Sequence, residues 1–246
     1  MDQRFSGQTA IITGGASGIG LAIARRISAE GGTVCIFDND PTSLQRSAAE
    51  LHARAYQVDV SSESEVSAGI RQVVEQAGRL DILVHCAGIV GPTSTTIIDY
   101  RPEDFERVLR VNLFSAYYLT RQAMRPMLEQ KYGRILLISS MAGKEGNPGM
   151  VGYATSKAGI IGLVKAVGKE FAESGVTVNG LAPAVIRTPM NERTSPEQLR
   201  YLTERIPMKR MGTVEETASL ACWIVSKEAS FNTGFIFDLS GGRATY

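Results

Sequence analysis

The sequence predicts an α/β fold in which helices cover both faces of a seven-stranded parallel sheet. Two observations carry this prediction. Short apolar runs, often β-branched, recur along the 246 residues, and each is followed by a stretch with helical periodicity. Several runs are apolar at successive positions, which is typical of parallel strands buried on both faces. Because strand–helix–strand repeats form right-handed crossovers, the sheet is expected to be doubly wound.

The individual elements follow in chain order. Strands are expected at Thr9–Thr13, Thr33–Phe37, Arg54–Val58, Ile82–His85, Arg134–Ser139, Thr177–Leu181 and Phe235–Asp238. Three intervening stretches place apolar residues on one helical face, namely Glu63–Ala77, Phe105–Met127 and Tyr153–Phe171. The chain contains no linker, fixed-period repeat or low-complexity tract. Residues 1–246 are therefore expected to form a single domain.

One stretch interrupts this alternation. Residues 187–207 are long and polar, with three prolines and four arginines. Their place after the carboxyl end of a strand favours a lid over a site. The alternative is a surface loop that covers no site.

Composition excludes several classes of protein. A net charge of +1 leaves no basic footprint for nucleic acid. No apolar run approaches the roughly 18 residues of a membrane span, and the first residues lack a signal-peptide pattern, so a cytoplasmic protein is expected. Cys35, Cys86 and Cys222 are widely spaced in apolar surroundings and indicate buried thiols. With His52 and His85 as the two histidines, no metal site is expected.

A glycine-rich loop follows the first strand. It reads T-G-G-A-S-G-I-G from Thr13 to Gly20 and leads into a helix. Spaced glycines let the backbone approach a pyrophosphate, and a helix N-terminus offers free N–H groups. Glycines also serve ordinary turns, but a strand before and a helix after provide the context of a dinucleotide site. The predicted binding residues in this loop are Gly14, Ser17, Gly18, Ile19 and Gly20.

Asp38 ends the second strand, 18 residues after Gly20. A carboxylate at that place accepts hydrogen bonds from the ribose hydroxyls of the adenosine and repels a 2′-phosphate. No Arg or Lys stands beside it. The sequence therefore predicts NAD rather than NADP as cofactor. The alternative is that Asp38 only caps a helix or forms a turn, as is expected for Asp40.

Later motifs complete a pattern that resembles the short-chain dehydrogenase/reductase family. The T-G-x-x-x-G-x-G spacing is that of the family's cofactor loop. Tyr153 and Lys157 stand four apart on one helical face, Ser140 lies 13 residues upstream, and Asn112 lies within R-V-N-L. Together they resemble the Asn–Ser–Tyr–Lys tetrad of the family's main branch. The likeness runs from about Gly7 to Gly242 and implies a Rossmann fold that serves as one dinucleotide-binding and catalytic domain.

The resemblance also implies further cofactor contacts. Asp59 and Val60 resemble the pair that contacts the adenine, and Ala87 and Gly88 resemble the small backbone beside the cofactor. A later segment resembles the one that holds the nicotinamide carboxamide, with Asn179, Pro183, Ile186 and Thr188. Two departures are present: His85-Cys86 replaces the frequent Asn-Asn, and Ala184 replaces the usual Gly. We interpret His85 as a structural histidine.

The chemistry implied is the interconversion of a secondary alcohol and a ketone. Tyr153 acts as general base or acid, and the positive charges of Lys157 and of the nicotinamide ring are expected to lower its pKa from about 10. Ser140 holds the substrate oxygen. Lys157 also binds the nicotinamide ribose. By resemblance, Asn112 holds a water that links Lys157 to solvent.

Substrate identity is more open. The loop Met141–Gly149 and the lid arginines, Arg187, Arg193, Arg200 and Arg205, suit a small polar substrate, but the arginines also suit a solvated surface. The chain's ending resembles dehydrogenases of sugar-derived hydroxy or keto acids, and its body also resembles 3-oxoacyl carrier-protein reductases. A non-catalytic NAD-binding sensor is a further alternative, disfavoured by the intact tetrad.

The resemblance finally implies a homotetramer. The tail Arg243–Tyr246 is expected at a subunit interface. Tyr246 would bury its ring there, and Arg243 or the terminal carboxylate would form an ion pair across the interface. A frayed end is the alternative.

Overall fold

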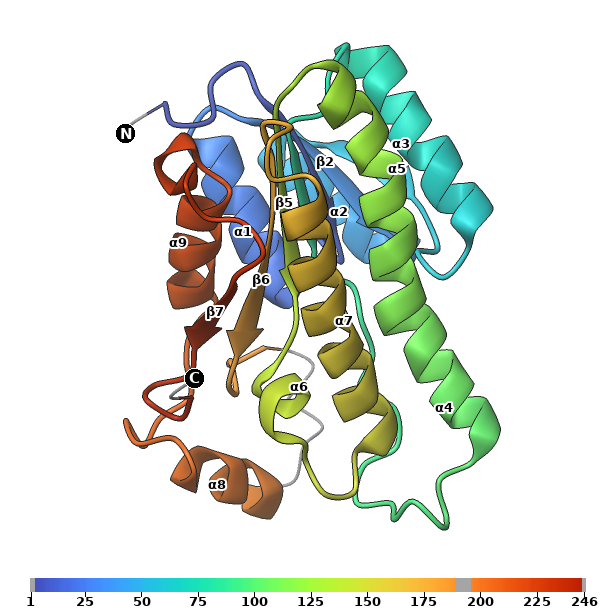
Figure 1. Ribbon diagram of the computed structural model, residues 1–246, viewed down its shortest axis with the longest axis vertical. Helices are drawn as coiled ribbons and strands as arrows, with labels where there is room; N and C mark the ends of the chain where they lie inside the picture. The colour runs from blue at the N-terminus through green and yellow to red at the C-terminus, as the bar shows by residue number, and fades with distance from the viewer. Residues whose placement is uncertain (1–2, 189–195, 245–246) are drawn as a thin grey trace.

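The computed structural model describes residues 3–188 and 196–244 and contains one sheet of seven parallel strands (Figure 1). The strand order is β3-β2-β1-β4-β5-β6-β7. The strands are β1 (Thr9–Thr13), β2 (Thr33–Asp38), β3 (Arg54–Gln57), β4 (Ile82–His85), β5 (Gly133–Ile138), β6 (Val176–Pro183) and β7 (Ile236–Leu239). The predicted doubly wound sheet is confirmed, and every predicted strand lies within two residues of its observed bounds at either end.

Helices cover both faces of the sheet (Figure 1). They are α1 (Gly18–Ala29), α2 (Pro41–Leu51), α3 (Glu63–Ala77), α4 (Pro102–Leu109), α5 (Ser115–Glu129), α6 (Met141–Glu145), α7 (Val151–Glu170), α8 (Pro196–Glu204) and α9 (Val214–Ile224), with a π turn η1 (Arg110–Phe114) and a 3-10 turn η3 (Lys227–Ala229). One apolar core lies under α3, α5 and α7, the other under α1, α2 and α9. Ile11 and Ile12 of β1 are both fully buried, one in each core. This explains why the strands read as continuous apolar runs.

The parallel register brings the carboxyl ends of the strands to one edge. Thr13 pairs with Phe37 on one side and with His85 on the other, and Ile138 pairs with Leu181. The strand order reverses between β1 and β4, and such a point is where α/β sheets bind ligands. The loops after β1, β2, β4 and β5 therefore all lie at this edge of the sheet.

One predicted helix differs from the structure. The helix predicted over Phe105–Met127 is interrupted, because the π turn η1 separates α4 from α5. A π turn adds one residue to the helical repeat, which apolar periodicity does not reveal. The predicted lid contains the helix α8, which lies beyond the carboxyl edge of the sheet (Figure 1). Residues 189–195 of the lid lie outside the described residues.

Within the described ranges, no helix has both the length and the apolar character needed to cross a membrane. The same ranges contain no group of three His, Cys, Asp or Glu residues arranged to hold a metal ion.

Candidate active site

The glycine loop packs so closely that side chains are excluded. Gly14 has φ +62°, and its N–H donates to the Phe37 carbonyl at 2.9 Å. A Cβ there would lie 2.9 Å from the backbone nitrogen of Ala87, and one on Gly20 would overlap the Gly14 carbonyl. Ser17 precedes α1 without a capping hydrogen bond, and the first turn of α1 carries no acidic residue. The positive end of α1, at Gly18, Ile19 and Gly20, is thus suited to an anion.

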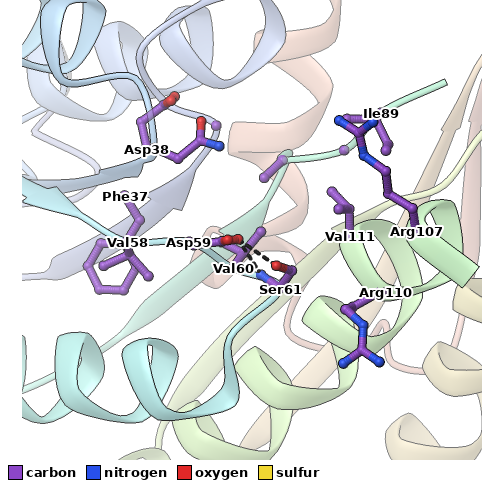
Figure 2. Close-up of a pocket in the computed structure, with 14 residues that line it drawn as sticks. Phe37, Asp38, Val58, Asp59, Val60, Ser61, Ile89, Arg107, Arg110 and Val111 are labelled. Carbon is purple, nitrogen blue, oxygen red and sulfur yellow. Dashed lines mark hydrogen bonds between the residues drawn. The ribbon is translucent and has the colours of Figure 1, made fainter. Parts of the chain in front are cut away.

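A cleft of about 310 Å³ opens beside this loop (Figure 2). Asp38 lines it from the end of β2. Its Oδ2 accepts from the Ala16 N–H at 3.2 Å and its Oδ1 from the Asp40 N–H at 3.1 Å. The lining residues are Gly14, Phe37, Asp38, Asn39, Val58, Asp59, Val60, Ser61, Ala87, Gly88, Ile89, Arg107, Arg110 and Val111. Six predicted cofactor residues are therefore brought together: Gly14, Asp38, Asp59, Val60, Ala87 and Gly88.

The opposite wall of this cleft holds two arginines that sequence analysis missed. Arg107 and Arg110 line the cleft across from Asp38 and Asp59, with the Arg107 side chain extending toward Ile89 and that of Arg110 pointing away from the two aspartates (Figure 2). The Asp59 Oδ1 accepts hydrogen bonds from the Ser61 N–H and hydroxyl, at 2.9 and 2.7 Å. The available signal was spacing: Arg107 and Arg110 are three apart on a helix, directly upstream of Asn112.

Ser140, Tyr153 and Lys157 meet beyond the end of β5. Ser140 precedes α6, where its Oγ accepts from the Ala142 N–H at 3.1 Å. Tyr153 lies in the first turn of α7, and Lys157 follows one turn later. The Lys157 Nζ donates to the Ile138 carbonyl at 2.8 Å and lies 5.7 Å from the centre of the Tyr153 ring. The predicted grouping of these three side chains is present.

Burial dominates the electrostatics of this group. It lowers the pKa of Lys157 to about 8. It raises the pKa of Tyr153, and a hydrogen bond with Ser140 opposes that rise. In the chain without cofactor, burial therefore outweighs any lowering by Lys157, and the expected lowering of the Tyr153 pKa by Lys157 and the nicotinamide ring together stays a prediction. The Lys157 ammonium is committed to the Ile138 carbonyl and stands by the ring rather than at the hydroxyl.

Asn112 lies in the π turn, fully buried. Its Oδ1 accepts from the Ile89 N–H at 2.8 Å, and its Nδ2 donates to the Ile89 carbonyl and to the Ser156 hydroxyl, both at 2.9 Å. Ser156 in turn donates to the Tyr153 carbonyl at 2.7 Å. Asn112 therefore clamps the loop after β4 to the helix that carries Tyr153 and Lys157. Its role in holding a water stays a prediction.

His85 joins the glycine loop to the π turn. The Ser115 hydroxyl donates to the Val111 carbonyl at 2.5 Å, so it accepts from the His85 Nε2–H at 2.9 Å. Nδ1 then accepts from the Thr13 hydroxyl at 2.7 Å, and Thr13 accepts from the Ala87 N–H at 3.3 Å. When the imidazole is neutral, each of these buried donors and acceptors has a hydrogen-bond partner. This geometry agrees with a structural histidine.

This arrangement predicts an acid-sensitive fold. Burial lowers the pKa of His85 from 6.5 to about 3, and the Lys157 charge adds to the effect. Between these values the unfolded chain binds one proton more than the folded one, so stability falls as the pH drops from 6.5 toward 3. His85 should contribute a slope of about 1.4 kcal/mol per pH unit. His85→Asn, which cannot take the proton, should lose stability less steeply.

Urea unfolding at about pH 7, 6 and 5 measures these slopes. The exposed His52, which ends α2 with φ +50°, provides the control substitution His52→Asn, because Asn accepts this conformation. Equal slopes for wild type and His85→Asn would contradict the prediction.

The residues predicted to hold the nicotinamide carboxamide lie in two different places. Pro183 ends the strand, Ile186 is buried and bridges to Gly212, and Thr188 is half-buried. Pro183 therefore lies at the carboxyl edge of the sheet, and Ile186 and Thr188 follow it. Asn179 does not join them, because it lies within β6. Its amide donates to a carbonyl at residue 232 and accepts from the backbone N–H of residue 235, at 2.8 and 3.2 Å.

A second cleft, of about 680 Å³, adjoins the first turn of α7. Its lining residues are Thr95, Ile97, Glu145, Gly146, Asn147, Pro148, Gly149, Val151, Ala154, Thr155 and Arg205. Val151, Ala154 and Thr155 share their helix turn with Tyr153. The size is within the range of small-molecule sites, and carboxylate, amide, hydroxyl and guanidinium groups converge on it.

Known proteins resemble the chain over almost its whole length. A family model described as enoyl-(acyl carrier protein) reductase matches residues 14–244. A 2-dehydro-3-deoxy-L-rhamnonate dehydrogenase (NAD(+)) from a Sphingomonas species is 42% identical over 99% of this chain and 98% of its own. A 3-oxoacyl-(acyl-carrier-protein) reductase from Rickettsia conorii is 36% identical over 97% of each.

Solved structures agree with this relationship. An NAD+-bound xylitol dehydrogenase has a TM-score of 0.93 and 31% identity, covering 97% of this chain and 100% of that chain. A levodione reductase has a TM-score of 0.93 and 30% identity, covering 99% of this chain and 100% of that one. The chain therefore belongs to the short-chain dehydrogenase/reductase family.

Proposed function

We propose that the protein is an NAD-dependent oxidoreductase that interconverts a secondary alcohol and a ketone by hydride transfer. The observation that carries this proposal is the meeting of Ser140, Tyr153 and Lys157 at the same sheet edge as the Asp38 cleft. The names of two relatives support it, since one is an NAD(+) dehydrogenase and the other an NAD+-bound xylitol dehydrogenase.

The residues present fit a dinucleotide. A Cβ on Gly14 or Gly88 would press on Ala87 or Asn112, so this part of the cleft depends on bare backbone. Asp38 would accept from the adenosine ribose, and the α1 N-terminus would face the pyrophosphate. The proposed NAD-binding residues are Gly14, Ser17, Gly18, Ile19, Gly20, Asp38, Asp59, Val60, Ala87, Gly88, Tyr153, Lys157, Pro183, Ile186 and Thr188.

The nicotinamide, when bound, accepts the hydride in alcohol oxidation and supplies it in ketone reduction. Ser140 holds the substrate oxygen by a hydrogen bond. Tyr153 removes the hydroxyl proton in oxidation and returns one to the ketone oxygen in reduction. Lys157 stabilises the charge that develops on Tyr153. Asn112 holds the loop after β4 and α7 at a fixed separation.

The proposed substrate is a small sugar-derived hydroxy or keto acid. The polar lining of the second cleft supports it, as does the name of the 42% identical relative. Reduction of a 3-oxoacyl thioester is the alternative, since a 36% identical relative carries that name. Asp38 counts against it, because those reductases usually prefer NADP. A sensor without turnover is disfavoured by the complete tetrad.

A substrate panel tests the proposed function. The purified protein should oxidise or reduce 3-deoxy sugar acids with NAD(H), followed at the nicotinamide absorbance. Other secondary alcohols and 3-oxoacyl thioesters, each with both cofactors, form the remaining arms. Turnover of the thioesters alone would favour the alternative, and binding of NAD without any turnover would favour a sensor.

We further propose that the protein is a cytoplasmic homotetramer and that each chain forms a single domain. Side chains of Phe114, Tyr117 and Phe235 are 42%, 47% and 56% exposed, and β7 is an edge strand. Such surfaces favour association with further copies. The free thiols of all three cysteines agree with a reducing compartment. The segment 187–207 is proposed to cover the substrate, and a single-chain mass in solution would contradict the tetramer.

A further inference from the structure

The C-terminal turn folds back toward α6. After β7, Gly241 and Gly242 have φ +59° and +88°, a conformation that glycine adopts readily. The Arg243 N–H donates to the Ser240 carbonyl at 3.2 Å, and the Ala244 N–H to the Ser240 hydroxyl at 2.9 Å. The turn therefore fixes the direction in which Arg243 leaves the sheet. Residues 245–246, with the predicted aromatic anchor Tyr246, lie outside the described residues.

The Arg243 guanidinium binds the loop that follows Ser140. Nε and Nη2 donate to Glu145 Oε2 at 2.9 and 2.6 Å, and Nη2 also reaches Asn147 Oδ1 at 3.4 Å. The Arg243 side chain is only 5% exposed. Arg243 forms this ion pair within the chain, where low exposure strengthens it relative to a surface pair. The expected contact of the tail with a neighbouring subunit stays a prediction.

A second ion pair of opposite polarity stands beside the first. Lys144, next to Glu145 on α6, pairs with Asp238 of β7 at 2.9 Å. Consecutive residues of α6 are therefore held by β7 and by the tail. This leaves α6 and the loop after it little freedom to move away from the end of the sheet.

The same turn also holds the opposite wall of the second cleft. The Gly241 carbonyl accepts from the Met208 N–H at 3.1 Å, and added Cβ atoms on Gly241 and Gly242 would meet Ile206 and Pro207. Arg205, which lines the cleft, directly precedes this segment. The C-terminal turn therefore joins the Glu145 wall to the Arg205 wall.

We propose that Arg243 is a positioning residue for the substrate, resting on the proposed sugar-acid function. It fixes the distance between the two walls and compensates the Glu145 charge in a cleft that must accept a carboxylate. Both Arg243 bonds to Glu145 end on Oε2, so Oε1 is placed to accept from a substrate hydroxyl. Without Arg243, an uncompensated carboxylate would repel an anionic substrate.

Kinetics separate this role from a merely structural one. Arg243→Gln should raise KM for the sugar acid about 10-fold, the order expected for one charged hydrogen bond. kcat should stay within about 2-fold and KM for NAD should not change. Arg243→Lys should restore part of the lost affinity. A small neutral alcohol, too short to reach Glu145, should be used equally well by all variants.

Arg210→Gln is the matched control. Arg210 forms a comparable two-bond pair with Glu216 at 2.6 and 2.9 Å, but it is 53% exposed and does not line the cleft. This variant should keep wild-type KM. Amide hydrogen exchange provides a readout that needs no substrate: residues 141–149 should exchange faster in Arg243→Gln than in wild type or Arg210→Gln.

The outcomes are distinct. If wild type turns over no sugar acid, the proposed function is wrong, and the role of Arg243 is then judged with the best substrate of the panel. Faster exchange with unchanged KM would reduce Arg243 to a structural anchor and overturn the proposal. Unchanged exchange together with unchanged KM would overturn it as well.

Discussion

Tyr153→Phe is expected to lower kcat by about 10²–10⁴-fold, the usual contribution of a general acid or base. The ring should keep its place 5.7 Å from Lys157 Nζ, because phenylalanine has the same shape. The hydroxyl that exchanges the proton, and the hydrogen bond with Ser140, are removed. NADH affinity, measured by the fluorescence of the reduced nicotinamide, should stay close to that of wild type.

Tyr56→Phe serves as the control for removing a buried hydroxyl. Tyr56 is buried on β3 and donates to Gln76 Oε1 at 2.7 Å, far along the chain from Tyr153. It should lose stability and keep its turnover. Turnover of Tyr153→Phe within a few-fold of wild type would remove Tyr153 from the mechanism.

The second large effect concerns cofactor choice. Wild type should use NADP with a kcat/KM about 100-fold below that for NAD, because placing like charges together costs several kcal/mol. Asp38 is held at the cleft by the N–H groups of Ala16 and Asp40, so it cannot turn away without losing both bonds. Asp38→Asn keeps the shape but not the charge. The gap between the two cofactors should therefore narrow.

Asp40→Asn controls for the loss of a nearby negative charge. Asp40 is two residues away and caps α2 through the Thr42 N–H at 3.1 Å, a bond that asparagine can also accept. This variant should keep the wild-type preference. Equal use of NAD and NADP by wild type would show that Asp38 does not read the ribose.

The fold could be predicted because its signals are local. The helix Glu63–Ala77 has its predicted bounds, with Ser62 capping its start and Gly78 in the left-handed conformation at its end. Parallel strands then bring their carboxyl ends together by geometry alone. The grouping of Ser140, Tyr153 and Lys157 follows from that geometry and from the four-residue spacing on α7.

The remaining features depend on contacts between distant parts of the chain. Arg243 and Glu145 are 98 residues apart, and neither residue indicates its partner. Burial of the Tyr153 hydroxyl decides the direction of its pKa shift, and burial is a property of the packed fold. The arginines of the Asp38 cleft, Arg107 and Arg110, read in sequence as an ordinary solvated face.

The π turn η1 sets the rotational phase between α4 and α5. Each added residue turns a helix by roughly 100°, and with η1 in place Val108 lies against Gly91 while Asn112 binds Ile89, so both side chains face the loop after β4. Deleting one residue from η1 would restore a regular α-helix and improve its hydrogen bonding. It would also rotate α4 against α5 by about that angle, and Val108 and Asn112 could no longer both keep their contacts. The length of this segment is therefore constrained more tightly than the identity of most side chains in it.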